Sequence, residues 1–106
     1  MKSRKTSWNH NYAYIRWATK KVGKRNSILD VGCGDGTLAQ YLRTTDNNIL
    51  GIDISDSAIQ IANKYNSYSN ISFFQTTFED FQENNKNFDA IIFVASIHHM
   101  DIWFIN

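Results

Sequence analysis

The stretch Ile28-Leu29-Asp30-Val31-Gly32-Cys33-Gly34-Asp35-Gly36-Thr37-Leu38 decides the fold of this 106-residue chain. A short apolar run leads into glycines at every second position, which predicts a buried strand over Ser27 to Val31 that enters a tight turn. The apolar and helix-favouring residues that follow predict a helix through about Arg43. Because glycine has no Cβ, such a turn lets the backbone approach a nucleotide-like ligand at the start of a helix.

A second carboxylate stands where a nucleoside site would need one. Asp53 closes the apolar run Ile49 to Ile52, about 20 residues after Gly32, which is the offset at which a βαβ unit places a carboxylate on the ribose hydroxyls. A dinucleotide fingerprint would place its third glycine at Thr37. Asp30, at the end of the first strand, would repel a pyrophosphate but suits an amino group. The pattern therefore favours a nucleoside that carries an amino group over a dinucleotide.

Composition limits the class of protein. The chain is 42% hydrophobic and 14% aromatic, so it has enough apolar residues for one packed domain over residues 1–106. Its net charge of +1 gives no electrostatic case for nucleic acid or a membrane surface as partner. No apolar run approaches the ~20 residues of a membrane span. The single cysteine, Cys33, excludes an intrachain disulfide and fits a reducing, cytoplasmic location.

Strands and helices alternate along the rest of the chain. Three further strands are expected at 49–53, 71–75 and 88–95, a polar turn at 84–87, and an amphipathic N-terminal helix at 8–22. A third helix is expected after a Ser57–Gln60 capping box. Near-continuous apolar strands that alternate with helices predict an α/β, Rossmann-like doubly wound parallel sheet in the order 3-2-1-4, with helices on both faces. The ligand should lie over the carboxyl ends of strands one and four.

The expected helices have predicted buried faces. The N-terminal helix should bury Trp8, Tyr12, Ile15, Thr19 and Val22 and end at Gly23, and Trp17 is also expected in the core. The third helix should bury Ala58, Ile61, Ala62 and Tyr65. Asp89 begins a strand at the end opposite the ligand and is expected to cap a neighbouring segment.

From Trp8 to Asp101 the chain resembles the class I S-adenosylmethionine-dependent methyltransferases, and Leu29 to Gly36 is similar to their motif I. Trp8-Asn9-His10-Asn11 and the segment Ala95 to Asp101 are similar to parts of one small-molecule-type bacterial subgroup. The resemblance implies S-adenosyl-L-methionine as cofactor and methyl transfer to an unidentified small-molecule acceptor. It names no catalytic residue, because the acceptor is unknown.

The resemblance also implies a set of cofactor-binding residues. In it, Asp30 and the backbone of the glycine turn hold the methionine part, Asp53 takes the ribose hydroxyls and Ile54 packs on the adenine. Thr77 stands where the family usually has an acidic residue near the adenine amino group, and the backbone N–H of Phe78 is available beside it. The full set is Asp30, Gly32, Cys33, Gly34, Gly36, Asp53, Ile54, Thr77, Phe78 and Val94, with Ala95 beside Val94 on the pocket floor.

The family's fold continues through strands five to seven, whereas this sequence stops at Asn106, so a partial methyltransferase domain is expected. Strand four would then be an edge strand with the apolar segment Ile102 to Ile105 exposed behind it. We therefore expect Ile91, Phe93, Trp103 and Phe104 to be buried in a twofold homodimer through strand four and the C-terminal segment.

The sequence leaves two alternative functions open. One is a truncated, non-catalytic cofactor-binding or interaction module, and the other, less favoured, is an NAD-dependent oxidoreductase. His98 and His99, with Asp101 and the distant His10, do not form an i, i+4 pair, so no metal site is predicted. Cys33, between two glycines, is expected as a small residue that fits a turn rather than as a nucleophile.

Overall fold

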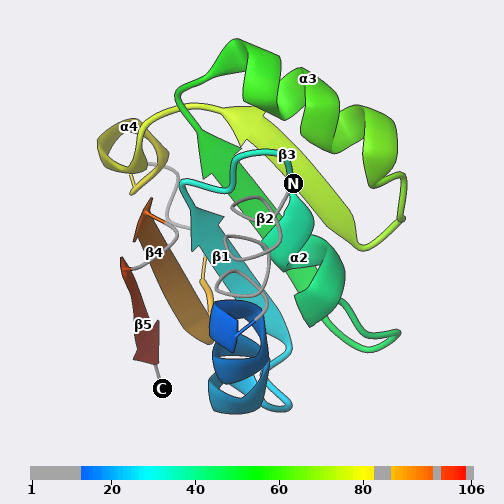
Figure 1. Ribbon diagram of the computed structural model, residues 1–106, viewed down its shortest axis with the longest axis vertical. Helices are drawn as coiled ribbons and strands as arrows, with labels where there is room; N and C mark the ends of the chain where they lie inside the picture. The colour runs from blue at the N-terminus through cyan, green and yellow to red at the C-terminus, as the bar shows by residue number, and fades with distance from the viewer. Residues whose placement is uncertain (1–12, 83–86, 97–98, 105–106) are drawn as a thin grey trace, which may run out of the picture.

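The computed structural model describes residues 13–82, 87–96 and 99–104. It contains one five-stranded sheet in the order β3-β2-β1-β4-β5, with helices packed around it (Figure 1). Residues 13–22 form an N-terminal helix. The other elements are β1 (Ser27–Val31), α2 (Thr37–Leu42), β2 (Asn48–Asp53), α3 (Asp56–Tyr65), β3 (Ile71–Gln75), α4 (Phe78–Gln82), β4 (Ala90–Ser96) and β5 (His99–Phe104). The predicted Rossmann-like α/β fold and its order 3-2-1-4 are confirmed.

Strands β1 to β4 are parallel, with β1 paired to both β2 and β4 and β2 paired to β3. Their carboxyl ends therefore meet at one edge of the sheet, at the top of the view in Figure 1. The turns that leave β1, β2 and β3 all start at this edge. It is the edge at which open parallel sheets bind ligands.

The expectation that strand four forms the edge of the sheet is wrong. Residues 99–104 fold back as β5 and pair antiparallel with β4, with Ile92 opposite Ile102 and Ile91 opposite Trp103. This hairpin gives partners to backbone groups of β4 that an edge strand would leave unpaired. Ile102 packs against the core, whereas Trp103 is 64% exposed. The free edge thus belongs to β5, and the homodimer stays a prediction without its original premise.

The two faces of the sheet are covered unequally. One face packs the N-terminal helix, α2 and α3 against strand residues that include Ile28, Ile49 and Phe73. On the other face, Phe81 of α4 packs with Leu29 and Ile52. Helices therefore lie on both faces, as predicted. Helix α4 itself was not anticipated from the sequence.

The N-terminal helix follows its predicted phase in part. Gly23 follows the helix with a positive φ of 60°, as expected for a residue that ends a helix. Thr19 and Trp17, however, are exposed, although both were predicted to be buried. Its buried residues are Ile15, Ala18 and Val22. Ala18, fully buried, takes the place expected for Thr19, because a side chain this small lets the helix approach the sheet closely. The predictions for Trp8 and Tyr12 lie outside the described residues, as does most of the predicted 84–87 turn.

The predicted start of α3 is wrong, and its predicted buried face is confirmed for Ala62 but wrong for Ile61 and Tyr65. Ser55, not Ser57, caps the helix, and its hydroxyl accepts a hydrogen bond from the N–H of Ala58 at 3.2 Å. The fully buried side chains are Ile59 and Ala62. Ile61 and Tyr65, predicted to be buried, are exposed. The inward stripe of the helix continues into a buried polar residue, Asn66, which apolar periodicity does not detect.

Candidate functional site at the carboxyl ends of the strands

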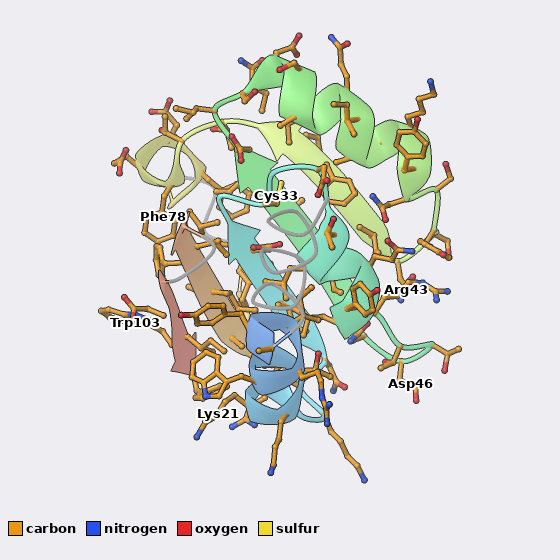
Figure 2. All side chains as sticks on the ribbon, viewed as in Figure 1. Lys21, Cys33, Arg43, Asp46, Phe78 and Trp103 are labelled. Carbon is orange, nitrogen blue, oxygen red and sulfur yellow. The ribbon has the colours of Figure 1, made fainter. Side chains whose placement is uncertain are left out.

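The glycine loop after β1 is bound to the end of β2 by backbone hydrogen bonds. The N–H groups of Gly32 and Cys33 both donate to the carbonyl oxygen of Ile52, at 2.8 and 3.0 Å. The N–H of Gly34 donates to Oδ2 of Asp53 at 2.9 Å. These three N–H groups are therefore occupied by bonds within the protein and are not free to bind a ligand. Figure 2 shows Cys33 at the upper end of the sheet, where this loop lies.

Gly32 and Gly34 differ in the space around their Cα atoms. A Cβ on Gly32, which has φ 79°, would lie 2.8 Å from the carbonyl oxygen of Val94, so glycine is needed there for the close approach of the loop to β4. A Cβ on Gly34 would meet no atom of the described residues within 4 Å. Gly34 thus marks an open side of the loop, where a ligand could approach the backbone.

Gly36 is required for packing rather than for an open surface. A Cβ there would lie 2.7 Å from Nδ2 of Asn66 and 2.8 Å from the ring of Phe73. Asn66 Nδ2 also donates to the carbonyl oxygens of Asp35 and Ala62, at 3.2 and 2.9 Å. Asn66 therefore links the end of α3 to the glycine loop. Sequence reasoning missed this residue, and a lone asparagine after a helix carries no signal of such a contact.

Asp30 is the most unusual side chain of the site. It is fully buried, and within the described ranges neither of its carboxylate oxygens has a hydrogen-bond partner. Burial, together with the nearby charge of Asp53, raises the pKa of Asp30 to about 7. A buried, unpaired carboxylate is costly to ionise. This position therefore suits a ligand that brings a positive charge or a hydrogen-bond donor.

Asp53, at the end of β2, is held differently. Its Oδ1 accepts from the N–H of Ser55 at 2.9 Å, and its Oδ2 accepts from Gly34. A carboxylate oxygen has two lone pairs, so each of these atoms can still accept from a ligand hydroxyl. Ile54, the next residue, is 71% exposed and presents an apolar surface beside these acceptors. Together they suit a sugar diol joined to a flat apolar ring.

The segment after β3 closes the same edge of the sheet. Oγ1 of Thr77 accepts from the N–H of Asp80 at 3.1 Å, so this hydroxyl caps α4 and keeps one lone pair for a ligand. Phe78 is the first residue of α4, and its N–H has no partner within the helix. Its ring packs edge-on against Phe93 of β4, with centroids 5.0 Å apart, which fixes the start of α4 beside β4 (Figure 2).

Cys33 behaves as a structural residue. It is buried, and this burial, with the charges of Asp30 and Asp53, raises the pKa of its thiol well above the usual range. A thiol that stays protonated is a poor nucleophile. The interpretation of Cys33 as a small residue fitted to the turn is therefore supported.

No group of three His, Cys, Asp or Glu side chains in the described part of the chain could hold a metal ion. His10 and His98 lie outside the described residues. At the opposite end of the sheet, Oδ2 of Asp89 accepts from the N–H groups of Asn26 and Ser27, at 3.0 and 3.1 Å. The predicted capping role of Asp89 is confirmed.

None of the described helices is both long enough and apolar enough to cross a lipid bilayer.

Comparisons with known proteins agree with this arrangement. The chain is 34% identical over 80 residues to a ubiquinone biosynthesis O-methyltransferase of Actinobacillus pleuropneumoniae, covering 69% of this chain and 34% of the relative. It is 35% identical over 78 residues to a fatty-acid O-methyltransferase of Mycolicibacterium smegmatis, covering 72% and 28%. The chain thus spans about a third of the length of the curated relatives it matches.

Among solved structures, the plantazolicin methyltransferase BpumL in complex with SAH is similar with a TM-score of 0.66 and 28% identity, over 86% of this chain and 37% of that one. A family model described as a methyltransferase domain matches residues 28–103. This match begins in β1 and ends in β5, and so includes the glycine loop and both strand-end carboxylates. The chain belongs to the methyltransferase-domain family.

Proposed function

We propose that this chain is the cofactor-binding part of an S-adenosyl-L-methionine-dependent methyltransferase. The observation that carries the proposal is Asp30, a fully buried carboxylate without a hydrogen-bond partner among the described residues, beneath an open glycine loop. The cofactor brings an ammonium group and a sulfonium, and a positive charge there would stabilise the carboxylate. The relatives named as methyltransferases, and the similar structure that holds SAH, support the proposal.

The residues present fit this cofactor. An ammonium group needs acceptors. The N–H groups of Gly32, Cys33 and Gly34 are occupied, and the carbonyl oxygen of Cys33, which accepts from the N–H of Gly36 at 3.0 Å, keeps a second lone pair. Asp30 would supply the counter-charge. Asp53 retains lone pairs for both ribose hydroxyls.

The adenine would lie between Ile54 and the segment that starts α4. The exposed side chain of Ile54 would cover one ring face. The N–H of Phe78 would donate to a ring nitrogen, and Thr77 would accept from the amino group with its second lone pair. Val94 would form the floor, and Gly36 would act through the packing of the loop.

When bound, S-adenosyl-L-methionine supplies an electrophilic methyl group on a sulfonium. The described residues hold and orient the donor, and alignment with the acceptor is the main requirement of an in-line displacement. No residue of the chain is assigned as a catalytic base.

The acceptor, the location and the assembly belong to the same proposal. We propose a small-molecule acceptor with an oxygen nucleophile, which is supported by two relatives named O-methyltransferases. A cytoplasmic location is supported by the single cysteine, Cys33, which is a free thiol in the structure. A homodimer would now have to use β5, whose Trp103 is exposed.

Calorimetric titration with S-adenosylhomocysteine, a non-reacting product, tests the cofactor assignment. The variant Asp53→Ala should lose measurable binding, because the ribose loses its acceptors and the loop loses its bond to Gly34. Asp53→Asn keeps one acceptor oxygen and should bind weakly. Asp46→Ala, the same change in an exposed loop at the other end of β2, is the matched control and should bind like the wild type.

Two results would overturn the assignment. One is an Asp53→Ala variant that retains its fold by circular dichroism and binds with unchanged affinity. The other is a thermal shift with NADH and none with S-adenosylhomocysteine, which would indicate a dinucleotide site.

A further inference from the structure

We infer that cofactor binding to this chain expels a proton from Asp30, so that affinity for the cofactor rises with pH through the neutral range. The inference rests on the proposed function, because it takes the ammonium group of the cofactor as the cation that faces Asp30. It adds a property of the site that the binding assignment alone does not contain. In the linked step, Asp30 loses its carboxylic proton to solvent, and the resulting carboxylate pairs with the ammonium group, which keeps its own protons.

The surroundings of Asp30 explain why the free protein would hold the proton. Asp30 lies on β1 between β2 and β4, and its register neighbours are Gly51 and Ile92, neither of which carries a charge. The side chain is fully buried, and in the described segments both oxygens are unpaired. Water and protein donors therefore do little to stabilise a negative charge on it.

The ionisable groups that face Asp30 from the described elements are Asp53, at the end of β2, and Cys33, in the glycine loop. Both are acidic groups, so neither can act as a counter-ion. The charge on Asp53 instead opposes the ionisation of Asp30, which adds to the effect of burial. The described part of the site thus contains two carboxylates, and the ammonium group of the ligand would supply the positive charge that Asp30 lacks.

The raised pKa of Asp30 links ligand binding to proton release. With its pKa raised to about 7, Asp30 is roughly half protonated in the free protein near neutral pH. An ammonium group placed against it favours the charged form and lowers its pKa. By linkage, binding must then release the proton, and the protonated fraction of the free protein weakens the apparent affinity.

The experiment is calorimetric titration of the wild-type chain with S-adenosylhomocysteine, from about pH 6 to about pH 8, in pairs of buffers that differ in ionisation enthalpy. The apparent affinity should rise about tenfold over this range. Close to one proton should be released per ligand at about pH 6 and close to none at about pH 8. The variant Asp30→Asn should bind more weakly, with neither effect. Because the ligand's own amino group titrates identically in both experiments, the difference between the two proteins isolates Asp30.

Two further measurements separate the possible failures. Adenosine lacks the ammonium group and should bind to the wild type without proton release. If S-adenosylhomocysteine binds with no proton release, or with the same pH dependence in Asp30→Asn, then the inference is wrong and the binding site stands. If neither ligand binds, the proposed function fails, and the inference fails with it.

The carboxyl carbon signal of Asp30, followed by NMR in the wild type, makes the test independent of whether the variant folds. It should titrate near neutral pH in the free protein and stay in its ionised position across the same range with S-adenosylhomocysteine bound. A signal that is already ionised at about pH 6 in the free protein would contradict the inference.

Discussion

Replacing Asp30 with asparagine should stabilise the protein at neutral and alkaline pH and remove a pH dependence from its folding. The pKa of this carboxyl group is ordinarily 3.8, and burial in the folded chain raises it to about 7. At a pH between these two pKa values, Asp30 holds a proton in the folded state that it has lost in the unfolded state. The free energy of unfolding therefore falls as pH rises from about 4 to about 7, by about 4 kcal/mol in total.

Asp30→Asn has no proton to lose, so it should lack this fall. The buried amide has its own cost, because its unpaired polar atoms are removed from water, and that cost is about 1–3 kcal/mol at every pH. The difference between the two pH profiles is thus more informative than stability at a single pH. The stability of the variant minus that of the wild type should therefore be about 4 kcal/mol more favourable above pH 7 than near pH 4.

Urea denaturation followed by circular dichroism at a series of pH values measures the effect. Asp46→Asn serves as the control, because Asp46 is exposed in the loop before β2. Parallel stability profiles for the wild type and Asp30→Asn would refute the reasoning, since they would mean that Asp30 titrates alike in the folded and unfolded states.

Three other substitutions have expected outcomes. Ser55→Ala removes the hydroxyl that caps α3 and should cost about 1 kcal/mol in urea denaturation, whereas an unchanged midpoint would mean that the cap contributes nothing. Asp89→Ala leaves two backbone N–H groups at the start of β1 without their acceptor and should cost about 1 kcal/mol, with no change in S-adenosylhomocysteine affinity because it lies at the far end of the sheet. Gly32→Ala places a Cβ 2.8 Å from the Val94 carbonyl oxygen in a positive-φ conformation and should cost about 3 kcal/mol, and a native-like melting temperature would contradict the close approach.

The four parallel strands were predictable because each is a short apolar run ended by a turn signal. The bounds of β1 and β3 agree with the predicted ones, and the register follows from the buried face of each strand. Strand β5 was not predictable in this way. Its sequence, His99 to Phe104, mixes polar and apolar residues without a clear period, and it becomes a strand by pairing with β4, which is a tertiary interaction.

The error in α3 has a different cause. The chosen stripe through Ile61 and Tyr65 and the observed stripe through Ile59 both fit a helical period. In the observed phase the helix ends at the buried Asn66, whose side chain bonds to the glycine loop. Periodicity alone cannot choose between two apolar faces, and no local pattern contains a long-range contact such as that of Asn66.

The same distinction applies to the two carboxylates of the site. From the sequence, Asp30 and Asp53 each lie at the end of an apolar strand, and their spacing already predicts an amino group at Asp30 and ribose hydroxyls at Asp53. The structure separates them. Asp53 already accepts two backbone N–H groups before any ligand arrives, so its charge is supported and its spare lone pairs suit neutral hydroxyls. Asp30 has no such donor in the described residues, so it is the carboxylate at which an arriving cation gains most. Residue spacing could predict both roles, but it could not reveal their physical cause, which is that Gly34 and Ser55 donate to Asp53 while no described residue donates to Asp30.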